Sequence, residues 1–341
     1  MVSWTAVSRL AGSVARAVEF SPYAPLWGHP DVNTIVGRYW PVWLEAGEPR
    51  LFTTEPGVQV LGRCHWGHPG LGNWSQICDQ FRAAPAPVLV LVHGLEGSAE
   101  SNYMLWMARA ALQAGFDVVR MNVRTCGGTE HLAPTLYHSG LTTDLRAIVD
   151  QLSPRRLFVV GFSMGGNQAL KLAGEWGSQA PSHVAGVAAI SAPIDLAACA
   201  RRLTEPRNRI YESRFLRQLS QRLGRKARLQ PGRFSPAALE GVANIIDFDH
   251  RVTAPAFGFR DAWDYYEHSS AQRLLGRIEV PALLIQARDD PFIPFESFRV
   301  PPNPALTLLA PERGGHVSFL ARGRPRFWAA EQVIRFCQAY A

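Results

Sequence analysis

One stretch, residues 157–173, constrains the fold of this chain more than any other. The apolar run LFVV (157–160) has the length and composition of a short buried strand, and it leads directly into GFSMG (161–165), a G-x-S-x-G motif, and then into a helical pattern. Because glycine lacks a side chain, strand and helix can approach closely, and Ser163 is expected at a strained turn with its hydroxyl held above the strand. The motif therefore predicts a nucleophilic serine; the alternative is an ordinary Gly-rich turn.

Short apolar runs alternate with helical patterns along most of the remaining chain. The expected strands are 51–54, 58–65, 87–92, 116–123, 184–190, 280–287 and 305–309, and the expected helices are 102–113, 141–151 and 329–339. Such alternation implies right-handed crossovers and a mostly parallel central sheet flanked by helices, which is the α/β class. Binding and catalytic sites in such sheets lie beyond the carboxyl ends of the strands.

The 341 residues are interpreted as a single domain, 1–341, with two additions. A lead-in of about residues 1–50 is rich in Pro, Trp and Gly from residue 20 onward, and we expect it to be packed but irregular. Between about 195 and 272 the strand pattern stops, which predicts a helical cap insertion. One apolar stripe at helical spacing marks the insertion: Tyr211, Phe215, Leu216, Leu219 and Leu223. Arg and Lys surround the stripe, either as a solvated helix face or as an anion-binding patch.

Composition narrows the classes of function. The net charge of +7 comes without a basic motif interleaved with aromatic residues, so no nucleic-acid partner is expected. Five scattered cysteines without a C-x-x-C pair favour reduced thiols and a cytoplasmic location. No run reaches the ~18 apolar residues of a membrane span. Residues 1–17 have a rough amphipathic pattern that includes Arg9 and Arg16, which fits a plain N-terminal helix or one that contacts a membrane surface.

A serine hydroxyl becomes a good nucleophile when a neighbouring base removes its proton and a carboxylate orients that base. In open α/β sheets of this kind the three groups follow in the order Ser, Asp or Glu, His. Asp290 follows the expected strand 280–287 and is our choice of acid, with Asp289 as the fallback and a turn-capping role as the alternative. His316 follows the strand 305–309, behind two glycines, and is the expected base.

Negative charge that develops on the substrate oxygen needs backbone N–H groups already in place. The residue after the nucleophile, Met164, is expected to supply one of these donors. The second should come from the loop after strand 87–92, where His93-Gly94-Leu95 indicates the N–H of Leu95. We expect His93 to shape this loop and not to act as a base.

Taken together, these motifs resemble the YheT-type hydrolases, which have the α/β-hydrolase fold and are predicted esterases. The resemblance runs from about residue 25 onward and rests on the segments HGLEGS (93–98), NVR (122–124), CGGT (126–129), GFSMGGN (161–167), DDPF (289–292) and GHV (315–317). It implies a triad of Ser163, Asp290 and His316 that hydrolyses carboxylic esters. Arg124, Tyr137 and Asp144 also match the family pattern, which implies a role in holding the loop beneath the nucleophile.

The leading hypothesis is a carboxylesterase for short- or medium-chain acyl esters, with lipids next, so the expected partner is a small-molecule ester or lipid. Trp263, Tyr265 and Tyr266 either line an acyl pocket or belong to the core. The alternatives are a non-catalytic ligand-binding or scaffold protein on the same fold, or acyl transfer or thioester cleavage by the same triad. Neither H-E-x-x-H nor G-x-G-x-x-G after the first strand is present, so no metal and no cofactor is expected. The oligomeric state and peripheral membrane contact stay open.

Overall fold

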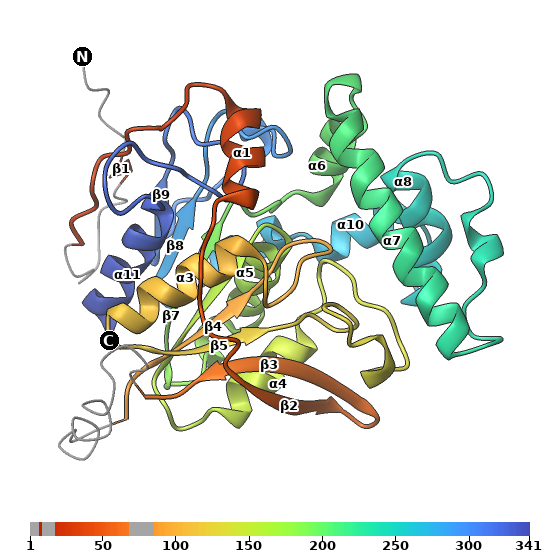
Figure 1. Ribbon diagram of the computed structural model, residues 1–341, viewed down its shortest axis with the longest axis horizontal. Coiled ribbons are helices and arrows are strands. Elements are labelled where there is room, and N and C mark those ends of the chain that lie inside the picture. The colour runs from red at the N-terminus through yellow and green to blue at the C-terminus, as the bar shows by residue number, and fades with distance from the viewer. Residues whose placement is uncertain (1–6, 9–17, 68–84) are drawn as a thin grey trace.

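A nine-stranded sheet forms the centre of the computed structural model, which describes residues 7–8, 18–67 and 85–341 (Figure 1). The strand order is β1-β9-β8-β7-β6-β4-β5-β3-β2. The strands are β1 (Val7–Ser8), β2 (Glu48–Glu55), β3 (Val58–His65), β4 (Val88–Val92), β5 (Asp117–Met121), β6 (Leu157–Phe162), β7 (Val184–Ile190), β8 (Ala282–Ile285) and β9 (Leu306–Leu309). Strands β4 to β9 pair in parallel, whereas β1, β2 and β3 join antiparallel at the two edges. The predicted α/β class with a mostly parallel sheet is confirmed.

The central strands are apolar on both sides because helices cover both faces of the sheet. In β4, Leu89 and Leu91 face one apolar core, while Val88, Val90 and Val92 face the other, as the two-residue period of a strand requires. The first core includes residues of α3 (Asn102–Gln113) and α11 (Trp328–Tyr340), which lie side by side in Figure 1. The second includes residues of α4 (Thr143–Gln151) and α5 (Met164–Trp176).

The lead-in differs from the irregular segment that we expected, because it contains the helix α1 (Pro30–Tyr39). Proline at the first helical position presets the backbone angle φ and loses no helical hydrogen bond there. Asp31 in the first turn and Arg38 in the last have the charges that the helix dipole favours at each end. The prediction of irregular structure rested on the Pro and Trp content of the segment and did not use these local signals. Helix α1 contacts the candidate site, because its Thr34 hydroxyl accepts a hydrogen bond from the N–H of His316.

Residues 195–272, here the cap segment, contain helices and no strand. The α-helices are α6 (Leu196–Leu203), α7 (Arg209–Leu229), α8 (Ile245–Phe248), α9 (Ala254–Ala256) and α10 (Ala262–Ser269). A π-helical turn (Asp249–Thr253) and two short 3-10 helices, Pro206–Asn208 and Pro236–Leu239, lie between them. In Figure 1 they lie together to one side of the sheet, and they share an apolar cluster. Of the predicted stripe, Leu219 and Leu223 are buried. The basic face is not wholly solvated, because Arg222 and Lys226 on α7 are buried. That the segment is an insertion into a single domain stays a prediction.

The amphipathic pattern predicted for residues 1–17 lies outside the described residues, apart from the backbone of β1, which pairs with β9. Of the five cysteines, the four that the structure describes are free thiols, and Cys78 lies outside it. In residues 7–8, 18–67 and 85–341, no helix combines the length and hydrophobicity needed to cross a bilayer.

Candidate active site

Ser163 stands between the end of β6 and the start of α5 with a φ of 51°, a left-handed backbone angle that is rare for residues other than glycine. The flanking glycines are required by close backbone contacts. A Cβ on Gly161 would lie 2.1 Å from the carbonyl oxygen of Gly165, and a Cβ on Gly165 would lie 2.4 Å from that of Val92. The strand, strained serine and helix that the motif predicted are therefore present.

The structure brings Ser163, His316 and Asp290 into one hydrogen-bonded series. His316 Nε2 lies 2.9 Å from the Ser163 hydroxyl oxygen, and His316 Nδ1 lies 2.8 Å from an Asp290 carboxylate oxygen. The Asp290 side chain is fully buried and that of His316 is 9% exposed. With Nδ1–H donating to the carboxylate, the unprotonated Nε2 faces the serine hydroxyl, which is the tautomer that a general base needs.

Asp290 is held by its own set of donors. The backbone N–H groups of Phe292 and Ile293 donate to its Oδ1 at 2.9 and 3.2 Å, and the Gln286 side-chain amide donates to its Oδ2. Asp289, the fallback acid, instead accepts a hydrogen bond from the N–H of Gly315 at 2.9 Å. The two neighbouring carboxylates therefore differ in place: Asp290 orients the ring of His316, and Asp289 contacts the backbone of its loop.

Three side chains from different parts of the chain fix the loop that carries His316. The backbone N–H of Gly315 donates to the Asp289 carboxylate at 2.9 Å. The N–H of His316 donates to the Thr34 hydroxyl at 2.9 Å, and the N–H of Val317 donates to the Ser191 hydroxyl at 3.0 Å. Thr34 lies on α1 and Ser191 lies directly after β7. Sequence reasoning missed both, since neither belongs to a motif that we used.

The two predicted oxyanion donors flank Ser163. Met164 begins α5, and Leu95 lies in the loop after β4. Within the described part of the chain, neither backbone N–H has a hydrogen-bond partner. The loop comes very close to the serine, because a Cβ on Gly94 would lie 2.9 Å from the Ser163 Cβ. Both N–H groups are therefore unpaired, which a donor to a substrate oxygen must be before substrate binds.

His93 is fully buried and contributes to the shape of the oxyanion loop. Its Nδ1 donates to the Gly94 carbonyl oxygen at 2.7 Å, and its Nε2 accepts from the N–H of Val123 at 3.0 Å. Burial lowers the pKa of His93 to about 4, so the ring is neutral at pH 7. Both ring nitrogens are engaged, which excludes His93 as the base, as the sequence predicted.

Buried polar contacts around the loop after β5 involve the three residues that match the family pattern, Arg124, Tyr137 and Asp144. Arg124 binds Asp144 of α4 through two hydrogen bonds of 2.9 and 2.6 Å, with 3% and 4% of the two side chains exposed. The Tyr137 hydroxyl donates to Glu96, directly after Leu95, at 2.7 Å. Arg124 and Asp144 thus join the β5 loop to α4, whereas Tyr137 contacts the oxyanion loop itself.

A mostly apolar cavity of about 140 Å³ opens onto Ser163 and His316 between the sheet and the cap segment. Its apolar wall includes Leu203, Phe215, Leu219, Leu223, Tyr265 and Tyr266. Trp263 is 44% exposed and does not line the cavity. Asp249 interrupts the apolar wall, where burial raises the pKa of its carboxyl to about 6 and the hydroxyls of Thr253 and Tyr266 donate to it. Among the described residues, no cluster of His, Cys, Asp and Glu could hold a metal ion.

Comparisons with known proteins show the family of this chain. The profile of the α/β hydrolase fold family matches residues 87–322. The Escherichia coli (strain K12) protein "Putative esterase YheT" is 33% identical over 277 residues, which cover 78% of this chain and 80% of that protein. Phospholipase ABHD3 of Mus musculus is 33% identical over 72% of this chain and 61% of its own length.

Solved structures share the fold. Esterase Pf2001 of Pyrococcus furiosus superposes with a TM-score of 0.52 at 18% identity, covering 86% of this chain and 92% of that one. At this identity the likeness bears on fold alone, and the family assignment rests on the sequence matches. The chain is therefore a hydrolase that belongs to the α/β hydrolase fold family and, within it, to the YheT-type group.

Proposed function

We propose that the chain hydrolyses carboxylic esters through an acyl-enzyme, with Ser163 as nucleophile, His316 as base and Asp290 as orienting acid. The observation that carries the proposal is the unbroken series of contacts from the serine hydroxyl through both nitrogens of His316 to Asp290, 2.9 and 2.8 Å long. This series ends at an apolar cavity large enough to take part of an acyl chain. The proposed chemistry needs no cofactor.

In the first half of the reaction, the Ser163 oxygen attacks the ester carbonyl carbon while its proton moves to His316 Nε2. The carbonyl oxygen becomes an oxyanion, for which the N–H groups of Leu95 and Met164 are the proposed donors. The intermediate then collapses: the bond from carbon to the alcohol oxygen breaks, and His316 returns the proton to that oxygen. Asp290 stabilises the imidazolium that exists between these steps.

In the second half, water replaces the alcohol. His316 Nε2 takes a proton from the water as its oxygen attacks the acyl carbon, and the same proton then returns to the Ser163 oxygen as the acid leaves. The start of α5 adds to the stabilisation of the oxyanion, because a helix N-terminus carries a partial positive charge. Acyl transfer or thioester cleavage would use the same groups and differ only in the leaving group or the attacking nucleophile.

Short- to medium-chain acyl esters are the proposed substrates, and lipids are the next candidates. The size and apolar walls of the cavity support an aliphatic acyl group. The names of relatives, a phospholipase and the monoacylglycerol lipase of Saccharomyces cerevisiae, support lipid esters as well. The cytoplasmic location suggested by the cysteine pattern stays a prediction.

The test is turnover of p-nitrophenyl esters from acetate to palmitate by the purified chain. Wild type should hydrolyse them with a maximum at one chain length, and Ser163→Ala should lose on the order of 10³-fold or more in kcat. Ser139→Ala is the matched control, because Ser139 lines the same cavity without contacting His316. Activity that survives in Ser163→Ala would contradict the proposal, and a scaffold protein would show no turnover in any variant.

A further inference from the structure

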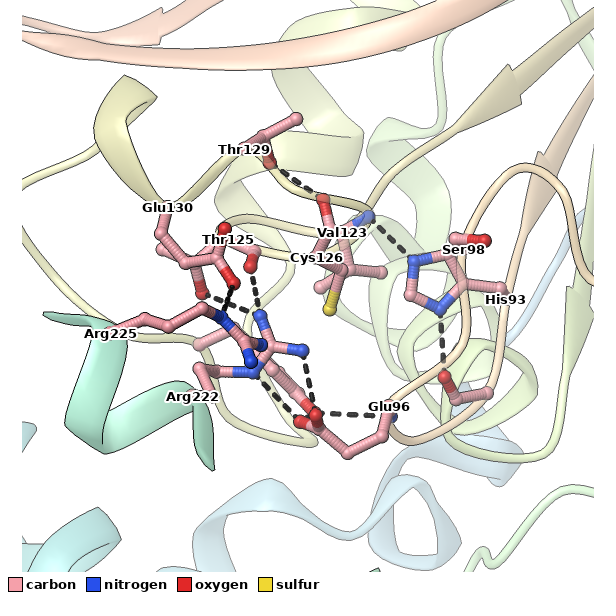
Figure 2. Close-up of polar contacts among 12 residues, drawn as sticks. His93, Glu96, Ser98, Val123, Thr125, Cys126, Thr129, Glu130, Arg222 and Arg225 are labelled. Atoms are coloured by element: carbon pink, nitrogen blue, oxygen red, sulfur yellow. Dashed lines mark hydrogen bonds and ion pairs between the residues drawn. The ribbon is translucent and has the colours of Figure 1, made fainter. Parts of the chain in front are cut away.

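One cap-segment side chain contacts two loops that border the candidate site. Figure 2 shows Arg222, from α7, reaching between the loop after β4 and the loop after β5. Its Nε and Nη2 each donate to a different carboxylate oxygen of Glu96 at 2.8 Å, a bidentate ion pair. Its Nη1 donates to the carbonyl oxygen of Thr125 and, at 3.3 Å, to the Thr125 hydroxyl. A single guanidinium thus joins the cap segment to both loops.

Both contacted residues have unfavourable backbone angles. Glu96 has a φ of 54° and Thr125 a φ of 63°, in the left-handed region that side chains with a Cβ rarely adopt. Such angles persist only where the surroundings fix them, and they are concentrated at functional sites. A β-branched residue such as Thr125 is especially rare there. The guanidinium of Arg222 is therefore a common fixed point for two strained turns.

The contact is buried and almost fully paired. The side chains of Arg222 and Glu96 are 6% and 3% exposed, and the Tyr137 hydroxyl gives Glu96 a third donor at 2.7 Å. Burial raises the pKa of Tyr137 well above its ordinary value, and the charge of Glu96 raises it further, so the phenol keeps the proton that it donates. The N–H of Glu96 donates back to the Tyr137 oxygen at 3.3 Å. Side chain and backbone of Glu96 are thus both fixed.

Glu96 directly follows Leu95, whose N–H is a proposed oxyanion donor. The backbone angles at Glu96 set the direction in which the chain leaves Leu95, and on the other side the Gly94 N–H is bound to the Tyr103 hydroxyl at 3.0 Å. We propose that Arg222 is a positioning residue that holds the oxyanion loop in its active geometry, so that the oxyanion site is complete only while α7 is docked. This inference rests on the proposed function.

Arg225, three residues further along α7, provides a matched control. It also binds a carboxylate outside the cap segment, since its Nε donates to Glu130 at 2.5 Å. Its side chain is 42% exposed, and among the described residues it makes no hydrogen bond to the loop 93–98. Replacement of Arg225 therefore removes a contact between α7 and Glu130 without removing the contact of α7 to Glu96.

The test compares Arg222→Met, Arg222→Lys and Arg225→Met by ester kinetics and by hydrogen–deuterium exchange of peptides covering 93–98. A lost or displaced oxyanion donor typically costs on the order of 10²-fold in kcat. We expect that loss in Arg222→Met. KM should stay within about threefold of wild type, because Arg222 borders the cavity with its guanidinium nitrogens bound to Glu96 and Thr125 and not free for substrate. Hydrogen–deuterium exchange in residues 93–98 should rise in Arg222→Met. Arg222→Lys should restore part of the kcat and part of the protection from exchange, and Arg225→Met should resemble wild type in both.

Removing Arg222 leaves the Glu96 charge buried without its partner, which can unfold a protein. The double variant Glu96→Gln with Arg222→Met removes both charges and serves if Arg222→Met alone does not fold. Unchanged kcat and unchanged exchange in a folded Arg222 variant would overturn the inference, and so would equal losses in Arg225→Met. If wild type hydrolyses no ester, the proposed function fails, whereas the exchange comparison still decides whether Arg222 holds the loop.

Discussion

At the scale of single residues, the site depends on side chains whose positions are fixed before any substrate binds. Asp290 accepts hydrogen bonds from His316, from Gln286 and from two backbone N–H groups, and it is fully buried. These donors leave it one orientation, and that orientation selects the tautomer of His316. The neighbouring Asp289 accepts from the backbone of Gly315 and does not contact the imidazole.

This difference gives a prediction about two adjacent carboxylates. Asp290→Asn should lower kcat by about 10³–10⁴-fold, because an amide can donate to Nδ1 and stabilise the wrong tautomer of His316. Asp289→Asn is the matched control: its amide oxygen can still accept from Gly315, and kcat should fall by less than about tenfold. Steady-state ester kinetics on both folded variants measure this. Equal losses of kcat in the two variants would contradict the assignment of Asp290 as the orienting acid.

Sequence reasoning found the residues that belong to local motifs and missed those that act from a distance. Ser163, Asp290 and His316 each follow a strand and stand within a recognisable segment. Thr34 contacts the N–H of His316 across 282 positions of sequence, and no local pattern marks it. Arg222 is one of many arginines in a segment whose basic face we interpreted as either a solvated helix face or an anion-binding patch. Only the packing of α7 distinguishes it from the others.

At the scale of elements, the candidate nucleophile depends on how closely α5 approaches β4 and β6. Gly165 lies at the contact, where an added Cβ would be 2.4 Å from the Val92 oxygen and 2.7 Å from the His93 oxygen. Backbone atoms cannot move aside as the end of a side chain can. Helix α7 contains a glycine in the opposite situation: a Cβ on Gly224 would meet only the end of Arg228, at 3.9 Å.

Alanine at the two helical glycines should therefore act in opposite directions. Gly165→Ala should destabilise the fold by at least about 2 kcal/mol through the backbone clash. Gly224→Ala should stabilise it by about 0.5–1 kcal/mol, because alanine loses less conformational entropy in a helix. Urea denaturation of both variants beside wild type checks the pair. A destabilised Gly224→Ala would mean that α7 does not keep its described helical geometry in solution.

The elements themselves were largely predictable, and the exceptions have physical reasons. The bounds predicted from sequence are found for the strands 58–65 and 184–190 and for the helix 102–113. Helix α1 was missed because the surrounding Pro and Trp residues indicated irregular structure, although proline is favourable at a first helical position. Helix α7 was expected from its apolar stripe, but its docking through buried cations was not.

At the scale of the whole molecule, the sheet brings together segments that are far apart in the sequence. The carboxyl ends of β4, β6 and β8 carry Leu95, Ser163 and Asp290, and α1 and β7 contribute the contacts that fix the loop of His316. The site therefore forms only when the whole sheet is folded, and activity should be lost in the same range of denaturant in which the chain unfolds.

Lowering the pH should lower the free energy of unfolding, because buried histidines are neutral in the folded chain. The pKa of His93 is about 4 in the folded chain because of burial, below its ordinary 6.5, so the unfolded chain binds the proton first as the pH falls. The stability that neutral His93 contributes is complete above pH 6.5 and is lost progressively between pH 6.5 and 4, by about 3 kcal/mol in total. His138 acts in the same direction, since burial lowers its pKa to about 3.

The corresponding variant is His93→Gln, which removes the titrating group. The unfolding free energy of wild type should fall more steeply between pH 6.5 and 4 than that of the variant, by up to about 1.4 kcal/mol per pH unit. Denaturant titrations over this range measure the slopes, and His131→Gln, at an exposed position, is the control. Parallel slopes for wild type and His93→Gln would contradict this, because they would show that the pKa of His93 is the same in the folded and the unfolded chain.

Covalent labelling shows whether Ser163 is a nucleophile activated by His316, on which the proposed reaction depends. We would treat wild type, Ser163→Ala and His316→Gln with a fluorophosphonate probe and measure the intact mass and the labelled peptide. We expect one adduct per chain on Ser163 in wild type, none in Ser163→Ala and a labelling rate lower by at least about 10²-fold in His316→Gln. A folded wild type that stays unlabelled, or an adduct on another residue, would contradict the proposed reaction.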